Sequence, residues 1–163
     1  MTTIYLSVGA NMGDRAGNIR RAIASLGAQR VRVTRVSSLY ETEPVEMREQ
    51  AWFLNCVVEA ETELEPQEVM EELLGIERSL GRERRVPKGP RAIDMDILLF
   101  GSRVVRTAGL GIPHPRMGER RFVLVPLAEI AAGVRHPVFQ KTIAELLAET
   151  GDQSEVRKWE EGG

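Results

Sequence analysis

Residues 89–100, GPRAIDMDILLF, form the most strand-like run of the chain, yet two aspartates interrupt it. Successive side chains of a β-strand point to opposite faces of a sheet. Asp94 and Asp96 are therefore expected on one face, whereas Met95 and Ile97 point to the other. The stretch predicts a strand that is apolar on one face and carries a pair of carboxylates on the opposite face.

The segments around this strand supply the other elements of an α+β fold. Strands are expected at residues 4–8, 31–40, 52–62 and 92–100, where apolar and β-branched residues run or alternate. One helix is expected after the turn NMGD, because apolar residues recur at helical spacing from Ile19 to Leu26, and a second from Pro66 to Gly81. The order β-α-β-β-α-β describes a ferredoxin-like antiparallel sheet with helices on one face.

A C-terminal extension follows this core. Residues 122–133, FVLVPLAEIAAG, are expected to form a short strand that runs into a helical turn. Thr142 and Glu145 form a capping box and predict a helix that begins at residue 143. Residues 151–163 are polar, so this tail is expected to fray.

Length and composition indicate one catalytic domain spanning residues 1–163. The chain is 42% hydrophobic, which is enough for a full core at this length. Its net charge of −2 comes from 22 basic and 24 acidic residues, so no global field favours nucleic acid or anionic lipid. A single cysteine, Cys56, excludes a disulfide framework, and no apolar stretch reaches membrane-spanning length. We expect a cytoplasmic monomer that binds neither nucleic acid nor membranes.

Basic residues gather in residues 78–91, just before the aspartates. Six cations face one acid, Glu83, which gives six minus one, a local charge of +5. Such a run is often only a solvated loop. Its position suggests a phosphate-binding role, because arginine forks and metal-binding carboxylates together suit phosphoryl-type transfer.

The aspartate pair, His114 and a strand asparagine each allow both a functional and a purely structural interpretation. Asp94 and Asp96, about 7 Å apart along a strand, could share two Mg²⁺ ions or merely neutralise arginines. His114 stands among Arg116, Arg120 and Arg121 in a loop that could close over phosphates, or it is an ordinary turn residue between prolines.

The third feature is an asparagine in an otherwise apolar strand. Phe53 and Asn55 share one face. A buried amide needs partners, so Asn55 either braces a neighbouring loop or reads the edge of a polar heterocycle that stacks on Phe53. By contrast, the stretch GANMGD, residues 9–14, fits no nucleotide-binding fingerprint and is expected to be a turn.

Taken together, the motifs resemble one enzyme family. The segments SVGANMGD, SSLYETEPVE, FLNCVVE, IERSLGRER, GPRAIDMDILLF and IPHPRMGERRFVLVPL occur in order from residue 4 to about residue 130. They closely resemble 6-hydroxymethyl-7,8-dihydropterin pyrophosphokinase, an enzyme of folate biosynthesis. The resemblance implies transfer of the two terminal phosphates of ATP to the hydroxymethyl group of a reduced pterin, with release of AMP and use of two Mg²⁺ ions.

The resemblance also implies roles for residues. Asp94 and Asp96 would hold the metal ions, and Arg82 and Arg91 would stabilise charge as the bond between the α and β phosphates breaks. The implied ATP site consists of Glu77, Arg82, Arg84, Arg91, Ile97, His114 and Arg120. The implied pterin site consists of Thr42, Pro44, Val45, Phe53, Asn55, Asp94 and Phe122. Loops around residues 41–50 and 82–91 would close over the substrates and exclude water.

Three positions depart from the family pattern: Lys88 replaces an aromatic residue, Gly118 a histidine and Leu74 a polar residue. Two other functions also fit the residues. A ferredoxin-like sheet with a basic loop could bind single-stranded RNA, although only 5% of the residues are aromatic. A metal-dependent phosphohydrolase would use the same aspartates with water as the nucleophile.

Overall fold

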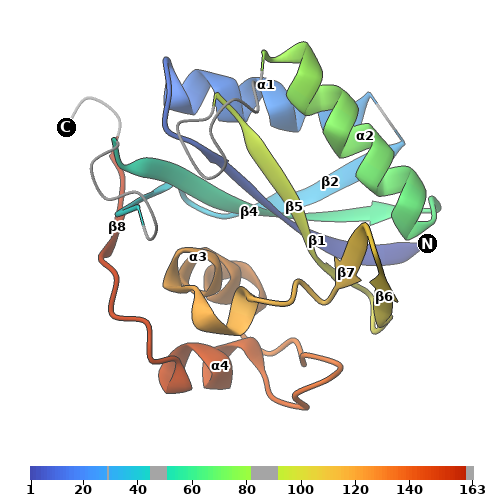
Figure 1. Cartoon of the computed structure of the whole chain (residues 1–163), viewed down its shortest axis with the longest axis vertical. Coiled ribbons are helices and arrows are strands. Elements are labelled where there is room, and N and C mark those ends of the chain that lie inside the picture. The colour runs from blue at the N-terminus through green and yellow to red at the C-terminus, as the bar shows by residue number, and fades with distance from the viewer. Residues whose placement is uncertain (29, 45–50, 82–91, 161–163) are drawn as a thin grey trace.

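The computed structural model describes residues 1–28, 30–44, 51–81 and 92–160, and a central antiparallel sheet separates two layers of helices (Figure 1). The strands are β1 (Thr2–Ala10), β2 (Val31–Val36), β3 (Tyr40–Thr42), β4 (Phe53–Thr62), β5 (Asp94–Phe100), β6 (Val105–Thr107), β7 (Leu110–Ile112) and β8 (Val156–Lys158). The helices are α1 (Arg15–Gly27), α2 (Pro66–Ser79), α3 (Arg121–Ala131) and α4 (Ile143–Glu149), with a short 3₁₀ turn at Met117–Glu119.

The sheet has the strand order β5-β1-β4-β3-β8, and β2 also pairs with β4. All these pairs are antiparallel, and β6 and β7 form a separate hairpin. The predicted ferredoxin-like order is confirmed, because β1, α1, β2, β4, α2 and β5 follow it. The sheet therefore places β1 between the strand that carries the aspartates and the strand that carries Asn55.

Each face of the sheet packs on its own apolar core. Met95 and Ile97 belong to the core beneath α1 and α2, together with Leu73 of α2. Leu98 belongs to the opposite core, with Leu127 of α3. Since side chains alternate along β5, Asp94 and Asp96 lie on the face that α3 and α4 cover. The predicted separation of the carboxylates from the apolar residues of this strand is confirmed.

The predicted helix starts are confirmed as well. Asp14 caps α1 by accepting a 3.0 Å hydrogen bond from the backbone N–H of Gly17. Pro66 stands at the start of α2, and Thr142 with Glu145 forms the capping box of α4. α1 and α2 lie on one face as expected, whereas the C-terminal extension adds α3 and α4 on the other (Figure 1).

Two predictions for the extension are wrong in their local structure. Most of residues 122–133 belong to helix α3, which ends at Ala131, and none of them forms a strand, although Pro126 lies within that helix. Val123, Leu124, Leu127 and Ile130 are buried at helical spacing, and this burial outweighs the hydrogen bond that proline cannot donate. Residues 156–158 do not fray but form β8, because the free edge of β3 offers backbone partners.

No helix within the described parts of the chain is long and apolar enough to cross a membrane.

Candidate active site

A row of paired residues crosses the sheet where β1 ends. Gly9 of β1 pairs with Asn55 of β4 on one side and with Asp94 of β5 on the other. Directly paired residues share a face, and neighbouring strands lie about 4.8 Å apart. Asn55 and Asp94 therefore stand about 10 Å apart across Gly9, on the face that carries α3.

Asn55 is held by contacts on both sides. Its side-chain amide donates a 2.7 Å hydrogen bond to the hydroxyl of Thr42 on β3, and both residues are buried. Its carbonyl oxygen lies against Gly9, where an added Cβ atom would stand only 2.2 Å away. Only glycine leaves room for the Asn55 side chain in this orientation. The amide is thus fixed in place by Thr42 and Gly9.

The aspartates lie on a strand that helix α2 braces from the side. Asp94 and Asp96 are half-buried, and Asp96 pairs across the sheet with the small residue Ser7 of β1. Between them, the backbone N–H of Met95 donates a 2.8 Å hydrogen bond to the carboxylate of Glu77, which is 2% exposed. Because β5 ends the sheet, this buried carboxylate satisfies an N–H group that would otherwise need water.

His114 lies beside this strand and is neutral at pH 7. Its backbone N–H donates to the carbonyl of Leu98 at 2.9 Å. Burial, followed by the positive charge of Arg120, lowers the pKa of His114 to about 4, although Asp94 acts in the opposite direction. Nδ1 accepts a 3.2 Å hydrogen bond from the N–H of Arg116, so Nε2 carries the proton and can donate to an anion.

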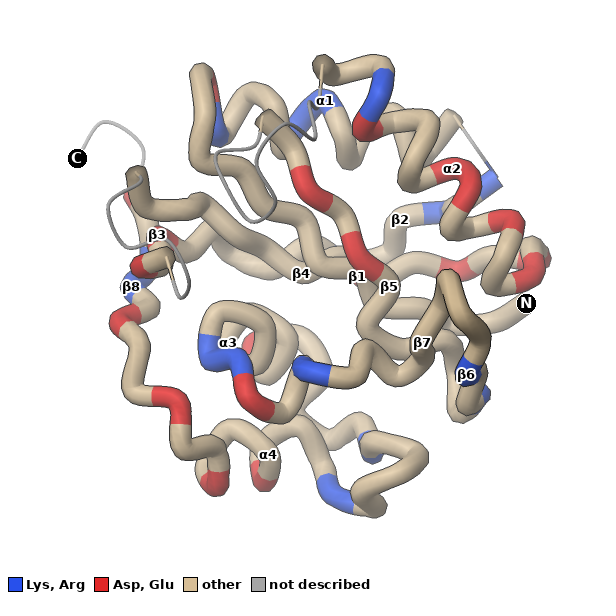
Figure 2. The backbone as a smooth tube through the Cα atoms, in the orientation of Figure 1, with Lys and Arg blue, Asp and Glu red and all other residues tan. Residues whose placement is uncertain are grey.

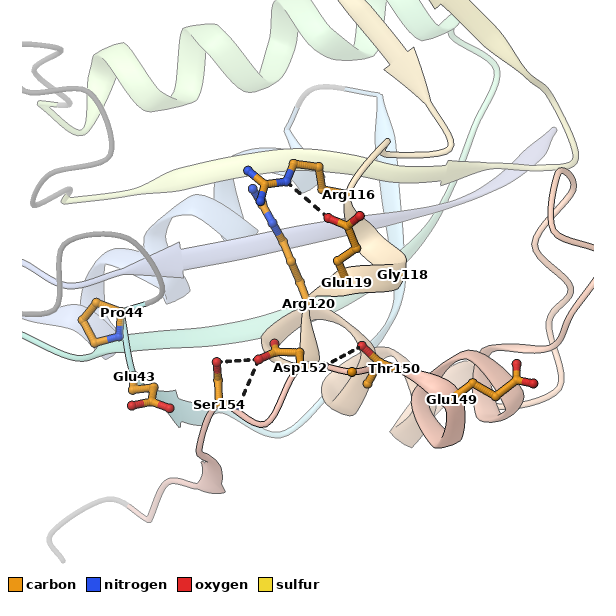
Figure 3. A pocket seen from close by; sticks show the side chains of 11 residues that line it. Glu43, Pro44, Arg116, Gly118, Glu119, Arg120, Glu149, Thr150, Asp152 and Ser154 are labelled. Carbon is orange, nitrogen blue, oxygen red and sulfur yellow. Dashed lines mark hydrogen bonds and ion pairs between the residues drawn. The ribbon is translucent and has the colours of Figure 1, made fainter.

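Basic side chains of the segment between β7 and α3 complete this side of the site. Figure 2 shows acidic residues along β5 and basic residues in that segment. The Arg120 guanidinium lies 5.5 Å from the centre of the Phe122 ring. A pocket of about 520 Å³ joins Arg116 and Arg120 to Pro44, which follows β3 (Figure 3). In this view both arginine side chains point towards the strands.

Comparison with known proteins identifies the family. The family model described as 7,8-dihydro-6-hydroxymethylpterin-pyrophosphokinase (HPPK) matches residues 5–132. The chain belongs to the HPPK family. It is 48% identical over 158 residues to the 2-amino-4-hydroxy-6-hydroxymethyldihydropteridine pyrophosphokinase of Bacillus subtilis, with 96% of this chain and 90% of that protein covered. The protein of the same name from Aquifex aeolicus is 40% identical, with 91% of this chain and 92% of that protein covered.

Solved structures agree on the HPPK fold. The Plasmodium falciparum HPPK-DHPS A437G chain, crystallised with SDX-DHP, is similar with a TM-score of 0.73 at 16% identity. The match covers 91% of this chain and 45% of the Plasmodium chain, so this chain spans less than half of that longer protein. The predicted HPPK activity, pyrophosphoryl transfer from ATP to hydroxymethyldihydropterin in folate biosynthesis, is confirmed.

The fold places several of the predicted site residues on one face of the sheet. Thr42, Asn55 and Asp94 lie on one face of the sheet, and Phe53 shares it because it pairs with Thr42. His114 lies close enough to Asp94 and Arg120 for their charges to shift its pKa. Ile97 keeps its side chain in the core, so only its backbone could contact a ligand. Val45, Arg82, Arg84, Lys88 and Arg91 lie outside the described residues.

Sequence reasoning overlooked two residues of this HPPK site. The sequence predicts a turn at Gly9, whereas Gly9 lies within β1 and makes room for Asn55. A glycine inside a strand pattern is itself a signal of close approach by another group. Ser7 lies within the strand expected at residues 4–8 and pairs with Asp96. Finding that pairing requires the register between β1 and β5, which the sequence alone does not provide.

Proposed function

We propose that pyrophosphoryl transfer takes place on the sheet face that carries Asp94, Asn55 and Thr42. One observation carries this proposal: Gly9 pairs with both Asn55 and Asp94, so a residue suited to read a heterocycle and a residue suited to bind metal share one face. A pterin on the Asn55 side would then direct its hydroxymethyl group towards Asp94. The two substrates would meet above Gly9.

Two Mg²⁺ ions fit the carboxylate pair. Asp94 and Asp96 offer hard oxygen donors from one strand face, and both side chains are half-exposed on the side of the sheet where His114 lies. Mg²⁺ commonly takes one or two carboxylates and completes its sphere with phosphate oxygens and water. Bound there, the ions would neutralise phosphate charge and orient the triphosphate.

Arginine side chains and the neutral His114 would bind the triphosphate. Arg120 and the Nε2–H of His114 lie on the side of Asp94, and a neutral imidazole can donate to a phosphate oxygen without carrying charge. Arg82, Arg84 and Arg91 would add further contacts, with Arg82 and Arg91 stabilising the charge that develops during transfer. The backbone of Ile97 would contact adenine. Glu77, whose carboxylate also accepts from the backbone N–H of Met95, would accept from a ribose hydroxyl.

The pterin would lie between aromatic rings. Phe53 from β4 and Phe122 from α3 would stack on its two faces, while Asn55 and the backbone near Pro44 and Val45 would satisfy its polar edge. The Thr42 hydrogen bond supports this role for Asn55, because it fixes the direction in which the carboxamide points. Asn55 would thus both hold β3 through Thr42 and recognise the pterin.

In the proposed reaction, the hydroxymethyl oxygen attacks the β-phosphorus of ATP and forms the new P–O bond. The bond between the β-phosphorus and the oxygen bridging to the α-phosphorus breaks, and AMP leaves with that oxygen. The hydroxyl proton passes to solvent. Positioning and charge neutralisation supply most of the rate enhancement in such transfers, so a dedicated base is not required.

A labelled-nucleotide assay tests this function. The chain is supplied with Mg²⁺, 6-hydroxymethyl-7,8-dihydropterin and ATP labelled at the β-phosphate. We expect label in the pterin product and one AMP for each pterin consumed, with no AMP when pterin is omitted. Release of ADP or pterin-independent turnover would indicate a phosphohydrolase, and absence of turnover would favour a binding module. We also propose that the protein is a cytoplasmic monomer. Gel filtration can check its oligomeric state.

A further inference from the structure

Residues 150–158, here named the C-terminal strap, connect two walls of the proposed site. The strap leaves α4, passes the start of α3 and ends in β8 beside β3 (Figure 1). It lies beyond residue 132, where the match to the family model ends. One wall is the start of α3, with Arg120 and Phe122, and the other is β3, with Thr42.

The strap caps helix α3. The residue before this helix, Arg120, provides no side-chain cap. Instead, one carboxylate oxygen of Asp152 accepts a 2.8 Å hydrogen bond from the backbone N–H of Arg121, and the other accepts from the N–H of Ser154 at 2.9 Å. The Arg121 guanidinium donates to the Ser154 carbonyl at 2.8 Å. Asp152 thus satisfies an end group of α3 that lies between Arg120 and Phe122.

At its other end the strap clamps β3. Tyr40, Glu41 and Thr42 pair with residues 156–158. The Arg157 guanidinium donates two hydrogen bonds to one oxygen of Glu41, at 2.8 and 3.2 Å, while Arg15 of α1 pairs with the other oxygen at 3.0 Å. Arg157 also lies over the Trp52 ring, 4.9 Å from its centre. Because Glu41 and Thr42 point to opposite faces, this clamp holds β3 from behind the proposed pterin site.

A pocket lies between the first part of the strap and the residues that follow β3. Thr150, Gly151, Asp152 and Ser154 line one side of the 520 Å³ pocket described above, and Pro44 and Arg120 line other parts of it (Figure 3). The strap therefore runs along the outside of the space between β3 and α3. A change in its length or attachment would alter the distance between these walls.

We propose that the C-terminal strap is a positioning element that sets the spacing between Thr42 and Phe122 and thereby the affinity for the pterin. Arg157 and Asp152 are its positioning residues, and neither needs to touch substrate. This inference rests on the proposed function, because it assumes that Thr42 and Phe122 bind the pterin. It extends that function to a segment outside the matched family region.

Steady-state kinetics on the full-length chain test the strap. We expect Arg157→Ala and Asp152→Ala each to raise the KM for the pterin roughly five- to tenfold. In Arg157→Ala, which removes a contact to β3 and none to α3, the KM for ATP should change less than twofold. Arg157→Lys keeps one charge-assisted hydrogen bond and should recover part of the loss. If both attachments act through one spacing, the double variant should be less impaired than the product of the single effects.

The matched control is Arg32→Ala. Arg32 pairs with Glu61 at 3.2 Å across β2 and β4, so this variant removes another arginine–glutamate pair of the same sheet. Its pterin KM should equal that of the wild type. Hydrogen exchange of the β3 amides gives a second readout, and we expect faster exchange in Arg157→Ala only.

Failure of the strap proposal can be distinguished from failure of the proposed function. A wild-type pterin KM in both Arg157→Ala and Asp152→Ala would overturn the strap proposal, even if β3 exchanges faster. Equal rises in the KM for both substrates in Arg157→Ala would also overturn it, since they indicate general loosening of the fold. Failure of the wild-type chain to use the pterin would instead overturn the proposed function.

Discussion

The side-chain amide of Asn55 donates a 2.7 Å hydrogen bond to the hydroxyl of Thr42, joining two neighbouring strands within the buried part of the sheet. A buried asparagine needs hydrogen-bond partners for its amide. This bond satisfies one amide donor and orients the rest of the group. Bracing and recognition are therefore compatible roles for the same side chain.

Thr42→Val should weaken both stability and pterin binding. Valine has nearly the shape of threonine but no hydroxyl, so the Asn55 amide loses its partner at a cost of about 1–3 kcal/mol in unfolding free energy. The pterin KM should rise because the amide can rotate. Urea denaturation and kinetics measure the two effects. Thr42→Ser keeps the hydroxyl, so equal losses in both variants would show that the hydrogen bond is unimportant.

Gly9→Ala should disturb the same asparagine from the other side. The added Cβ atom would stand 2.2 Å from the Asn55 carbonyl oxygen, which forces the side chain or β1 to move. We expect a loss of about 1–3 kcal/mol in unfolding free energy together with weaker pterin binding. The control is Gly75→Ala in helix α2, where no atom lies within 4 Å of the new Cβ. This control should stabilise the protein by about 0.5–1 kcal/mol.

Replacing Glu77 should loosen the strand that carries the aspartates. Glu77→Leu leaves the Met95 N–H buried without its acceptor, at a cost of about 1–3 kcal/mol, whereas Glu77→Gln keeps an oxygen there. We expect faster hydrogen exchange of the Met95 amide and a lower kcat in Glu77→Leu. Unchanged exchange in Glu77→Leu would mean that the carboxylate does not hold β5 and acts only on ligands.

His114 should titrate far below an ordinary histidine. Its pKa of about 4 means that the unfolded chain takes up this proton first as the pH falls. The unfolding free energy therefore falls between pH 6.5 and pH 4, by up to about 1.4 kcal/mol per pH unit, and is unaffected above pH 6.5. The chain has only two histidines, so NMR titration of the wild type and His114→Gln assigns the signal. A midpoint near 6.5 would contradict the half-buried, neutral imidazole.

Local sequence signals predicted much of this fold. Alternation around Asp94 and Asp96 assigned their face correctly, and Pro66, Thr142 and Glu145 marked helix starts, because these features act within a few residues. Residues 122–133 were misassigned because a short apolar run with a proline looks the same in a buried strand and a buried helix. β8 was overlooked because its three residues become a strand only through the edge of β3.

For the site as well, features with a local sequence signal were predicted and features that depend on long-range contacts were not. Asp94, His114 and Arg120 stand in motifs whose chemistry is visible in the sequence, and the fold brings them together. The role of Gly9 depends on the register that pairs it with both Asn55 and Asp94. The attachment of Asp152 to α3 depends on packing between segments 31 residues apart. Long-range relationships of this kind have no local pattern.

Asp96 gives the most direct test of the central claim, that Asp94 and Asp96 hold the metal ions for pyrophosphoryl transfer. Electron paramagnetic resonance can count Mn²⁺ ions bound to the chain with a non-cleavable ATP analogue and the pterin, since Mn²⁺ accepts the same oxygen ligands as Mg²⁺. We predict two ions in the wild type and in the exposed-acid control Glu63→Gln. Asp96→Ala should remain folded, bind fewer than two ions and form no AMP. Two bound ions and wild-type turnover in Asp96→Ala would contradict the account.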